Sequence, residues 1–402
     1  MTRIIHLAFP RSIQRNVIVL CIMAFLADLM FGIIGPTFSL FAISLGGTLV
    51  LVGTLGGLVN LTRLASTIPA GMGSDLWGRK GTLLLGFALL TVATGAYGLV
   101  QDPDLLFVPR LLEGAGTALA LTVGIAALSE AAPPLERGSA IGLYMTSMGL
   151  GYSLGGALGG SMVERLGFAR AYQLVALVPL VTLVILWRFY RPVEEAPAAV
   201  AAPTDVGAVL RLALHAYLLP ANLGNFLVSM TFSATVLSFF PLYAASAGVS
   251  AAVFGAFFGL RSLLSTLVRM PVGMLAPGRT LPLMTGAMAV IMIAMGFVPA
   301  TSSPPLLLVL LCAEGFAYGS FITVGQTHAS EYDSAQRGTV LGVYSAFGSF
   351  GSTLGSVLLG LLAQSAGLSS VFYATSVLLA IGIAPMLWLG RSAASRAWPD
   401  RS

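Results

Sequence analysis

Two segments of this chain, residues 137–160 and 337–360, repeat one residue pattern 200 positions apart. A second pair of motifs, Glu113-Gly114 and Glu314-Gly315, repeats at nearly the same distance. A long internal repeat predicts two structural units of one kind. The matched positions in the longer repeat are Arg137, Gly138, Gly142, Tyr144, Gly151 and Gly155 against Arg337, Gly338, Gly342, Tyr344, Gly351 and Gly355.

The composition of the chain excludes a water-soluble fold. Hydrophobic residues make up 57% of the 402 positions and charged residues only 9%, whereas a soluble domain carries about 25% charged residues. The net charge of +5 comes from Lys and Arg near the ends of apolar runs. It therefore indicates membrane topology and a lipid environment, with no nucleic-acid partner. No metal-ligand spacing or cofactor motif is present, and a monomer suffices for such a fold.

Twelve apolar segments are long enough to cross a bilayer, which takes about 20 residues per helix. An Ala- and Pro-rich connection at 191–215 separates the first six from the last six. It predicts an N-terminal bundle over 1–190, a linker and a C-terminal bundle over 216–402. Within the linker, Val206 to Leu214 is amphipathic and suited to the membrane surface. The predicted spans are 17–43, 49–70, 81–100, 105–129, 139–162, 171–190, 216–243, 251–275, 281–300, 305–328, 338–363 and 370–390.

The Lys and Arg positions predict how the spans are oriented. If the N-terminus lies inside, inner segments hold fourteen of the 20 basic residues, and outer loops hold only Arg165 and Arg170. Cytoplasmic loops carry an excess of Lys and Arg. We therefore predict a multi-pass protein of the cell inner membrane with both termini and the linker in the cytoplasm.

The connection between the second and third spans reads GMGSDLWGRK over residues 71–80. Gly71 and Gly78 permit a tight turn, and Asp75, Arg79 and Lys80 lie where they can pair or cap helix ends. The pattern resembles the G-x-x-x-D-x-x-G-R-K signature loop of the major facilitator superfamily. That resemblance implies a gating loop at the cytoplasmic side.

Three further motifs extend the resemblance along the chain. Span 4 carries L-x3-R-x2-E-G-x-G from Leu106, similar to the superfamily's fourth helix. Span 1 carries Asp28-x3-Gly32-x3-Pro36, which resembles a motif of twelve-helix drug:proton antiporters. Span 5 resembles the antiporter motif of helix 5, with small residues for close helix packing. Its glycines are Gly142, Gly151, Gly155, Gly156, Gly159 and Gly160.

The resemblance implies an all-α membrane protein with twelve transmembrane helices in two pseudo-symmetric six-helix bundles. Transporters of this kind work by alternating access to a midplane site. The motifs of spans 1 and 5 imply proton-coupled export, or antiport, of a small hydrophobic or amphipathic molecule. The alternatives are a metabolite uniporter or symporter, and a non-transporting lipid-handling or sensor protein. No motif supports an enzyme, since the G-x-S-x-G pattern at 151–155 lies within a predicted membrane helix.

Ionisable residues inside spans are costly and usually face a cavity or one another. The resemblance places spans 1, 4, 7 and 10 around the central cavity. We therefore select Asp28, Glu113 and Glu314 as proton-coupling candidates, with pairing between helices as the structural alternative. The candidates for cavity or charge-pair roles are Arg63, Arg110, Arg261, Asn222 and Asn225.

Two predictions concern how these charges pair. Asp28 and Arg63 lie at similar distances from the turn near Gly46, so we expect them to share a polar site directly or through water. Glu113 has Arg110 three residues earlier on the same helix face, whereas the matching position before Glu314 is Leu311. Desolvation favours a neutral acid. We therefore expect Glu314 to carry the coupling proton ahead of Glu113, unless Arg261 reaches it.

Overall fold

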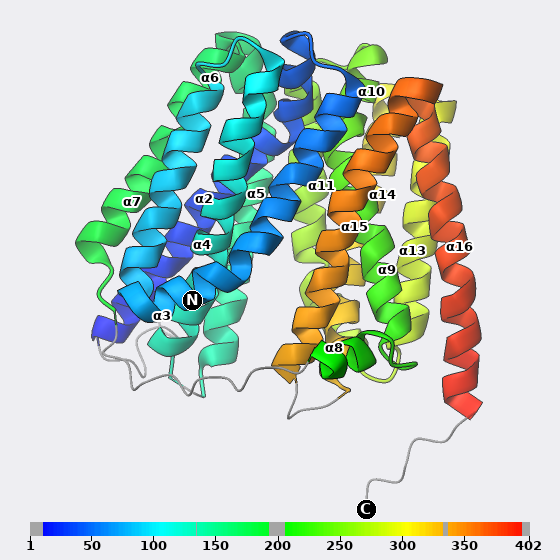
Figure 1. Cartoon of the computed structure of the whole chain (residues 1–402). Helices are drawn as coiled ribbons and strands as arrows, with labels where there is room; N and C mark the ends of the chain where they lie inside the picture. The colour runs from blue at the N-terminus through cyan, green and yellow to red at the C-terminus, as the bar shows by residue number, and fades with distance from the viewer. Residues whose placement is uncertain (1–10, 134, 193–205, 333–336, 396–402) are drawn as a thin grey trace, which may run out of the picture.

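The computed structural model describes residues 11–133, 135–192, 206–332 and 337–395, which fold into helices connected by short turns (Figure 1). Apolar residues dominate these helices, and each turn places a Gly, Pro, Ser or Asp where the helix must end. The helices of the first half are α2 (Arg11–Ser44), α3 (Leu49–Tyr97), η1 (Pro103–Leu106), α4 (Phe107–Ala131), α5 (Arg137–Leu166), α6 (Phe168–Val175) and α7 (Leu177–Phe189).

The second half repeats this order of long helices, with more interruptions. Its seventh crossing contains a π-helical stretch, and its eighth is divided at Val268. The elements are α8 (Val206–Ala213), α9 (Leu219–Met230), η2 (Thr231–Phe239), α10 (Phe240–Ser246), α11 (Ala251–Leu267), α12 (Arg269–Leu275), α13 (Thr280–Phe297), η3 (Val298–Ala300), α14 (Pro304–Ser330), α15 (Arg337–Ala366) and α16 (Leu368–Ser395).

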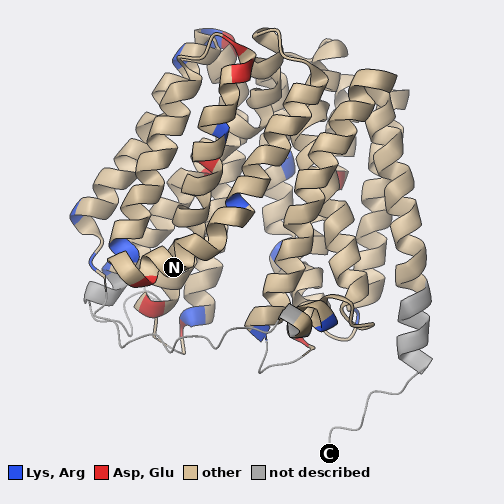
Figure 2. Cartoon of the chain, viewed as in Figure 1, with Lys and Arg blue, Asp and Glu red and all other residues tan. Residues whose placement is uncertain are grey.

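The described helices cross the bundle from one end to the other twelve times. Ten continuous helical segments are apolar and long enough to span a bilayer. One of them, α3, consists of two arms that meet at Gly78, where the backbone leaves the helical conformation. Helix α5 adds a thirty-residue crossing of its own. Figure 2 shows the charged residues gathered mainly at the two ends of the bundle. The predicted all-α, twelve-helix fold is confirmed.

Glycines with positive φ recur at matching positions in the two halves. Gly78 and Gly278 have φ of 75° and 70°, and Gly167 and Gly367 have φ of 76° and 83°. Each of these pairs is separated by 200 positions. Residues with a Cβ rarely adopt this left-handed region, so glycine is needed at these turns. The duplication read from the sequence therefore extends to the backbone geometry of the turns.

Within each half, the glycines of one helix allow a neighbouring helix to pack closely. A Cβ at Gly151 would overlap the carbonyl of Phe25 on α2, and a Cβ at Gly351 would overlap the carbonyl of Phe226 on α9. Small residues permit such close backbone approach in membrane helices. The α2–α5 and α9–α15 contacts are thus equivalent, and Phe25 and Phe226 lie 201 positions apart.

The two halves meet closely at one end of the bundle only. There, Gly53 on α3 lies against Ser356 and Gly360 on α15, and Gly160 on α5 lies against Ala251 on α11. We call this the closed end. The other end, where α2 begins, α16 ends and α8 lies (Figure 1), is the open end. At Gly142 and Gly342, near the open end, an added Cβ would have no atom within 4 Å.

Helix α8 lies at the open end, next to α15. It occupies the stretch that the sequence predicts to be amphipathic, Val206 to Leu214, and it ends at Ala213. Most of the predicted linker, residues 193–205, lies outside the described residues. Helix α8 therefore lies at the open end and directly precedes the seventh crossing, which begins at Leu219.

Candidate functional site

A cavity of about 560 Å³ lies between the two halves. Helices α2, α3, α4 and α5 line it on one side, and α9, η2, α11, α12, α14 and α15 line it on the other. Binding sites for small molecules commonly have volumes of roughly 300–1,000 Å³. Its larger aromatic and apolar lining residues include Phe31, Phe38, Met145, Met148, Tyr152, Phe232, Leu237 and Tyr318.

In the first half, Arg110 and Glu113 form an ion pair along α4. Arg110 Nη1 donates to Glu113 Oε2 at 2.8 Å, and both side chains are mostly buried. The Tyr97 hydroxyl donates to the same carboxylate oxygen. The Arg110 guanidinium also lies over the ring of Phe38, in a cation–π contact. Two donors, Arg110 and Tyr97, thus hold the Glu113 carboxylate in place.

In the second half, Arg261 and Glu314 form an ion pair between α11 and α14. Arg261 Nε and Nη2 donate to the two oxygens of Glu314 at 2.7 and 2.8 Å. The guanidinium lies 4.7 Å from the Phe232 ring centroid and 4.9 Å from that of Tyr318. Such a two-pronged, charge-assisted pair is among the stronger polar contacts in proteins.

This geometry meets the exception that was stated with the prediction for Glu314. Leu311 offers no charge, as expected, but Arg261 reaches the carboxylate from the neighbouring helix. Glu314 is also 0% exposed and is absent from the cavity lining. Both carboxylate oxygens are therefore occupied by Arg261. Glu314 is thus suited to fixing α14 against α11.

Asp28 differs from both glutamates. It is half-buried on α2 and lines the cavity, and it makes no hydrogen bond or ion pair with the residues that the structure describes. The groups that interact with it electrostatically are Arg269 on α12 and the tyrosines Tyr144 and Tyr152 on α5. No guanidinium therefore holds this carboxyl group in direct contact.

The expected partnership of Asp28 and Arg63 is not a direct ion pair. Arg63 Nη2 instead donates to Asn60 Oδ1, one turn earlier on α3, at 3.3 Å. Both charged residues nevertheless line the same cavity. Equal depth from the turn near Gly46 correctly placed the two residues in one cavity, but depth alone does not determine the direction of a side chain.

The two asparagines on α9, both candidates for cavity or charge-pair roles, lie in different surroundings. Asn225 lines it and donates to the Tyr344 carbonyl at 2.7 Å. Asn222 is buried elsewhere and donates to the Ala213 carbonyl at the end of α8, at 3.1 Å. Residues three apart on a helix are about 60° apart around its axis. That angle suffices here to turn Asn222 toward α8.

The π-helical stretch η2 is a feature that the sequence analysis missed. It supplies Phe232, Ser233, Leu237 and Ser238 to the cavity wall. Asn60 on α3 donates to the Ser233 hydroxyl at 3.1 Å, which connects the two halves. Insertions of this kind occur often at functional sites. The stretch 231–239 itself contains no Gly or Pro, and Pro241, two residues after it, was not singled out from the sequence.

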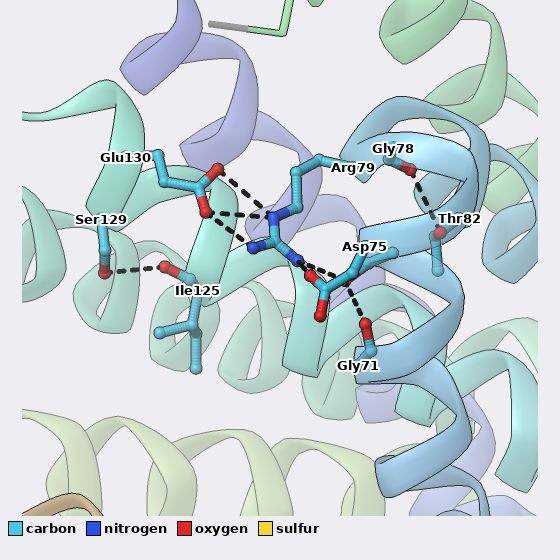
Figure 3. Close-up of polar contacts among 9 residues, drawn as sticks. Gly71, Asp75, Gly78, Arg79, Thr82, Ile125, Ser129 and Glu130 are labelled. Atoms are coloured by element: carbon cyan, nitrogen blue, oxygen red, sulfur yellow. Dashed lines mark hydrogen bonds and ion pairs between the residues drawn. The ribbon is translucent and has the colours of Figure 1, made fainter. Parts of the chain in front are cut away.

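The signature segment 71–80 is mostly helical, since residues up to Trp77 continue the first arm of α3 and only Gly78 breaks it. Figure 3 shows Arg79 between two carboxylates. Arg79 donates to Asp75 at 3.0 Å and to Glu130 on α4 at 2.8 Å. Glu130 was not selected from the sequence, because it lies fifty residues away with no motif around it.

Lys80 connects the signature segment to a further helix, α7, whereas the space beside Gly71 is open. Lys80 Nζ donates to the carbonyls of Trp187 and Tyr190 at 2.8 and 2.9 Å, so it caps the end of α7. Gly71 has no atom within 4 Å of an added Cβ. The segment thus fastens α3, α4 and α7 together within the first half.

The helix-5 glycines divide between two partners. Gly151, Gly155 and Gly159 face α2, where a Cβ would collide with backbone atoms. A Cβ at Gly156 would press on Phe258, and one at Gly160 would overlap the Ala251 carbonyl, both on α11. Gly142, in contrast, lies free near the open end. Helix α5 therefore packs within its own half and against the other half at once.

A polar cavity between two duplicated helical bundles is the architecture of a secondary membrane transporter. The sequence model of the Major Facilitator Superfamily matches residues 20–309 and 223–402 of this chain. The chain therefore belongs to the Major Facilitator Superfamily, as its motifs predict.

Three individual comparisons support this membership. The chain is 22% identical over 394 residues, 94% of its length, to the whole of an uncharacterized MFS-type transporter of Methanocaldococcus jannaschii. It is 28% identical over 353 residues, 82% of each chain, to the 3-(3-hydroxy-phenyl)propionate transporter of Escherichia coli. A bacterial homolog of the human lysosomal transporter Spinster has the same fold, with a TM-score of 0.83, 16% identity and coverage of 98% of this chain and 100% of that one.

Proposed function

We propose that this chain is a proton-coupled secondary transporter that exports a small, hydrophobic or amphipathic molecule in exchange for protons. The substrate would bind in the cavity between the halves. During transport the open end would close and the closed end would open, so that the cavity faces each side of the membrane in turn. The observation that carries proton coupling is Asp28. It is the cavity carboxylate that no arginine holds, whereas Glu113 is paired with Arg110.

The proposed role of Asp28 follows from its position. It lines the cavity, so a proton could reach it from whichever side the cavity faces. An unpaired carboxyl group in such a site can take up and release a proton without breaking an ion pair. Export is proposed from the span-1 and span-5 motifs, and Asp28 itself belongs to the first of these.

A second mode, cotransport of substrate and proton, is favoured by the arginines of the cavity. Arg63 and Arg269 line it, and neither forms an ion pair with a carboxylate in the part of the chain that the structure describes. A negatively charged substrate near them would be repelled by ionised Asp28 and accepted better by the protonated form. Binding linkage is reciprocal, so substrate and proton would then bind together and move in one direction.

Proteoliposomes with an imposed pH gradient distinguish the two modes. The probes are ethidium and 3-(3-hydroxyphenyl)propionate, one cationic and one anionic, with empty liposomes as the control. Uptake driven by an acidic lumen supports exchange, and uptake driven by an acidic exterior supports cotransport. If neither gradient drives either probe beyond the level of empty liposomes, the proposal of proton-coupled transport is contradicted.

A further inference from the structure

The charges that line the cavity do not balance. Four arginines line it, Arg63, Arg110, Arg261 and Arg269. Two of them are neutralised by ion pairs, Arg110 by Glu113 and Arg261 by Glu314. Asp28 is the one further carboxylate in the lining, so the described wall carries an excess of one positive charge when Asp28 is ionised and two when it is protonated.

The two remaining arginines form no ion pair with a carboxylate of the described residues, although Asp28 interacts electrostatically with Arg269. The Arg63 guanidinium donates to the neutral Asn60 side chain, at 3.3 Å. Arg269 Nε is buried and has no hydrogen-bond partner among the described residues. An unpaired buried guanidinium is costly in a membrane protein. Such groups commonly mark the path or the binding site of a charged substrate.

A hydroxyl group near Arg269 also lacks a partner. Ser262 is 3% exposed, lines the cavity and leaves its Oγ without a hydrogen bond among the described residues. It lies seven residues before Arg269, about two helical turns along the same side of α11 and α12. A hydroxyl and a guanidinium are both donors suited to the oxygens of an acid group.

Aromatic rings lie beside these donors. Phe232 and Tyr318 stack with ring centroids 4.6 Å apart, and Tyr318 interacts electrostatically with Arg63, Arg261 and Arg269. Tyr152 and Phe258 form a second aromatic contact, at 5.6 Å, and Tyr152 lines the cavity. The wall therefore combines apolar ring surfaces with unpartnered cationic donors.

We propose that the substrate is an amphipathic organic anion, its acid group bound between Arg63 and Arg269 and its apolar part against Phe232, Tyr318 and Tyr152. This inference names the substrate class of the proposed transport site, rests on that proposed function and, by the linkage argued there, favours its cotransport mode. A neutral molecule could accept hydrogen bonds from Arg269 and Ser262 but would leave the excess positive charge unbalanced, and a cation would add to it. Arg261 and Arg110 remain paired with their glutamates. Arg261 also contacts the rings of Phe232 and Tyr318, and Arg110 contacts the ring of Phe38.

The test is ligand-induced thermal stabilisation of the purified protein in detergent, with no gradient present. The probes are matched sets on two scaffolds: 3-phenylpropionate and 1-naphthylacetate, the corresponding amides, and the corresponding amines. We expect stabilisation by at least one carboxylate and much less by its amide or amine. Equal or greater stabilisation by the neutral or cationic members, or no response to any carboxylate, would overturn the inference.

Variants connect the response to the two arginines. Arg269→Gln and Arg63→Gln should each weaken the apparent affinity for the carboxylate at least about tenfold, because a charge-assisted hydrogen bond is lost. Arg269→Lys should keep part of the affinity. Arg170→Gln, on the exposed surface near the closed end, is the matched control. Each variant is compared with its own ligand-free melting temperature, so a loss of stability is separated from a loss of binding.

Failure of this inference is distinguishable from failure of the transport proposal. Binding is measured without a pH gradient, so proton coupling does not affect the binding result. Carboxylate binding that persists without gradient-driven flux would contradict proton coupling and leave the anion site standing. Gradient-driven flux of ethidium by a protein that binds no carboxylate would contradict the anion site and leave proton-coupled transport standing.

Discussion

The two halves of the molecule hold an equivalent glutamate in different ways. Glu113 and Glu314 lie 201 positions apart, on α4 and α14. Arg110 pairs with Glu113 from the same helix, whereas Arg261 pairs with Glu314 from the neighbouring helix. The position matching Arg110 is Leu311, and the one matching Arg261 is Val59. The two halves thus share the acid at the equivalent position but supply its arginine from positions that are not equivalent.

The unpaired charged residues of the cavity have no charged counterpart at the equivalent position of the other half. Asp28 corresponds to Ser229, 201 positions later, and Arg269 corresponds to Thr67, 202 positions earlier. The helices that carry them pack equivalently in the two halves. The comparison therefore separates two roles: the duplicated packing surfaces build the scaffold, and the charges present only once equip the cavity for its substrate and proton.

The largest effect on stability is expected from breaking the pair between helices. Glu314→Ala leaves Arg261 buried and uncompensated, which costs about 3–5 kcal/mol of unfolding free energy. The melting temperature in detergent measures the loss. The double variant Arg261→Met, Glu314→Met should recover most of it, because hydrophobic residues of similar size replace both charges. A double variant as unstable as Glu314→Ala would contradict this account.

The equivalent change in the first half should cost less. In Glu113→Ala, Arg110 loses one hydrogen bond where Arg261 loses two, and its side chain is more exposed, 8% against 2%. We expect a loss of about 1–3 kcal/mol, measured in the same melting experiment. A loss equal to that of Glu314→Ala would remove the proposed difference between the two pairs.

The closed end offers a third comparison. Glu164 on α5 accepts the Ala252 amide at the start of α11, and Gln364 on α15 accepts the Leu49 amide at the start of α3. These caps lie 200 positions apart and join opposite halves. Replacing either by Ala should weaken the closed end by about 0.5–2 kcal/mol. The charged Glu164 should contribute more because of the helix dipole.

Distances between spin labels placed on the two halves at the closed end test these caps. Glu164→Ala should broaden the distance distribution toward longer separations more than Gln364→Ala does. Unchanged distributions in both variants would show that the caps do not hold this end together.

The smallest effect is expected at Gly142, which has no atom within 4 Å of an added Cβ. Gly142→Ala should leave the melting temperature unchanged or raise it slightly, since Ala favours a helix by about 1 kcal/mol over Gly. Gly155→Ala on the same helix is the contrasting control, because its Cβ would overlap the Leu29 carbonyl. Equal destabilisation by both changes would contradict the packing described for α5.

Sequence reasoning succeeded where a pattern is local. Hydrophobic runs gave the twelve crossings, glycine spacing gave the helix-5 packing face, and the i,i+3 rule gave the Arg110–Glu113 pair. It failed where a side chain meets a distant helix. Arg261 and Glu314 are 53 positions apart, and Arg79 and Glu130 are 51 apart. Nothing in either local sequence encodes which way these side chains point.

The π-helical stretch is a different kind of omission. Residues 231–239 read TFSATVLSF, which is compatible with an ordinary helix. Pro241, which has no backbone N–H, follows two residues later, and the stretch makes tertiary contacts, among them Thr235 with Thr375 at 2.8 Å and Ser233 with Ser356 at 3.1 Å. Propensity is a weak prior that such contacts override.

The central claim is that Asp28, and neither glutamate, carries the coupling proton. The most direct test is gradient-driven transport in proteoliposomes by Asp28→Asn, beside Glu113→Gln as the matched carboxyl-to-amide control. We predict that Asp28→Asn loses the response to the pH gradient while it still exchanges substrate across the membrane without a gradient, and that Glu113→Gln keeps its response. Full gradient-driven transport by the Asp28→Asn protein would contradict the claim.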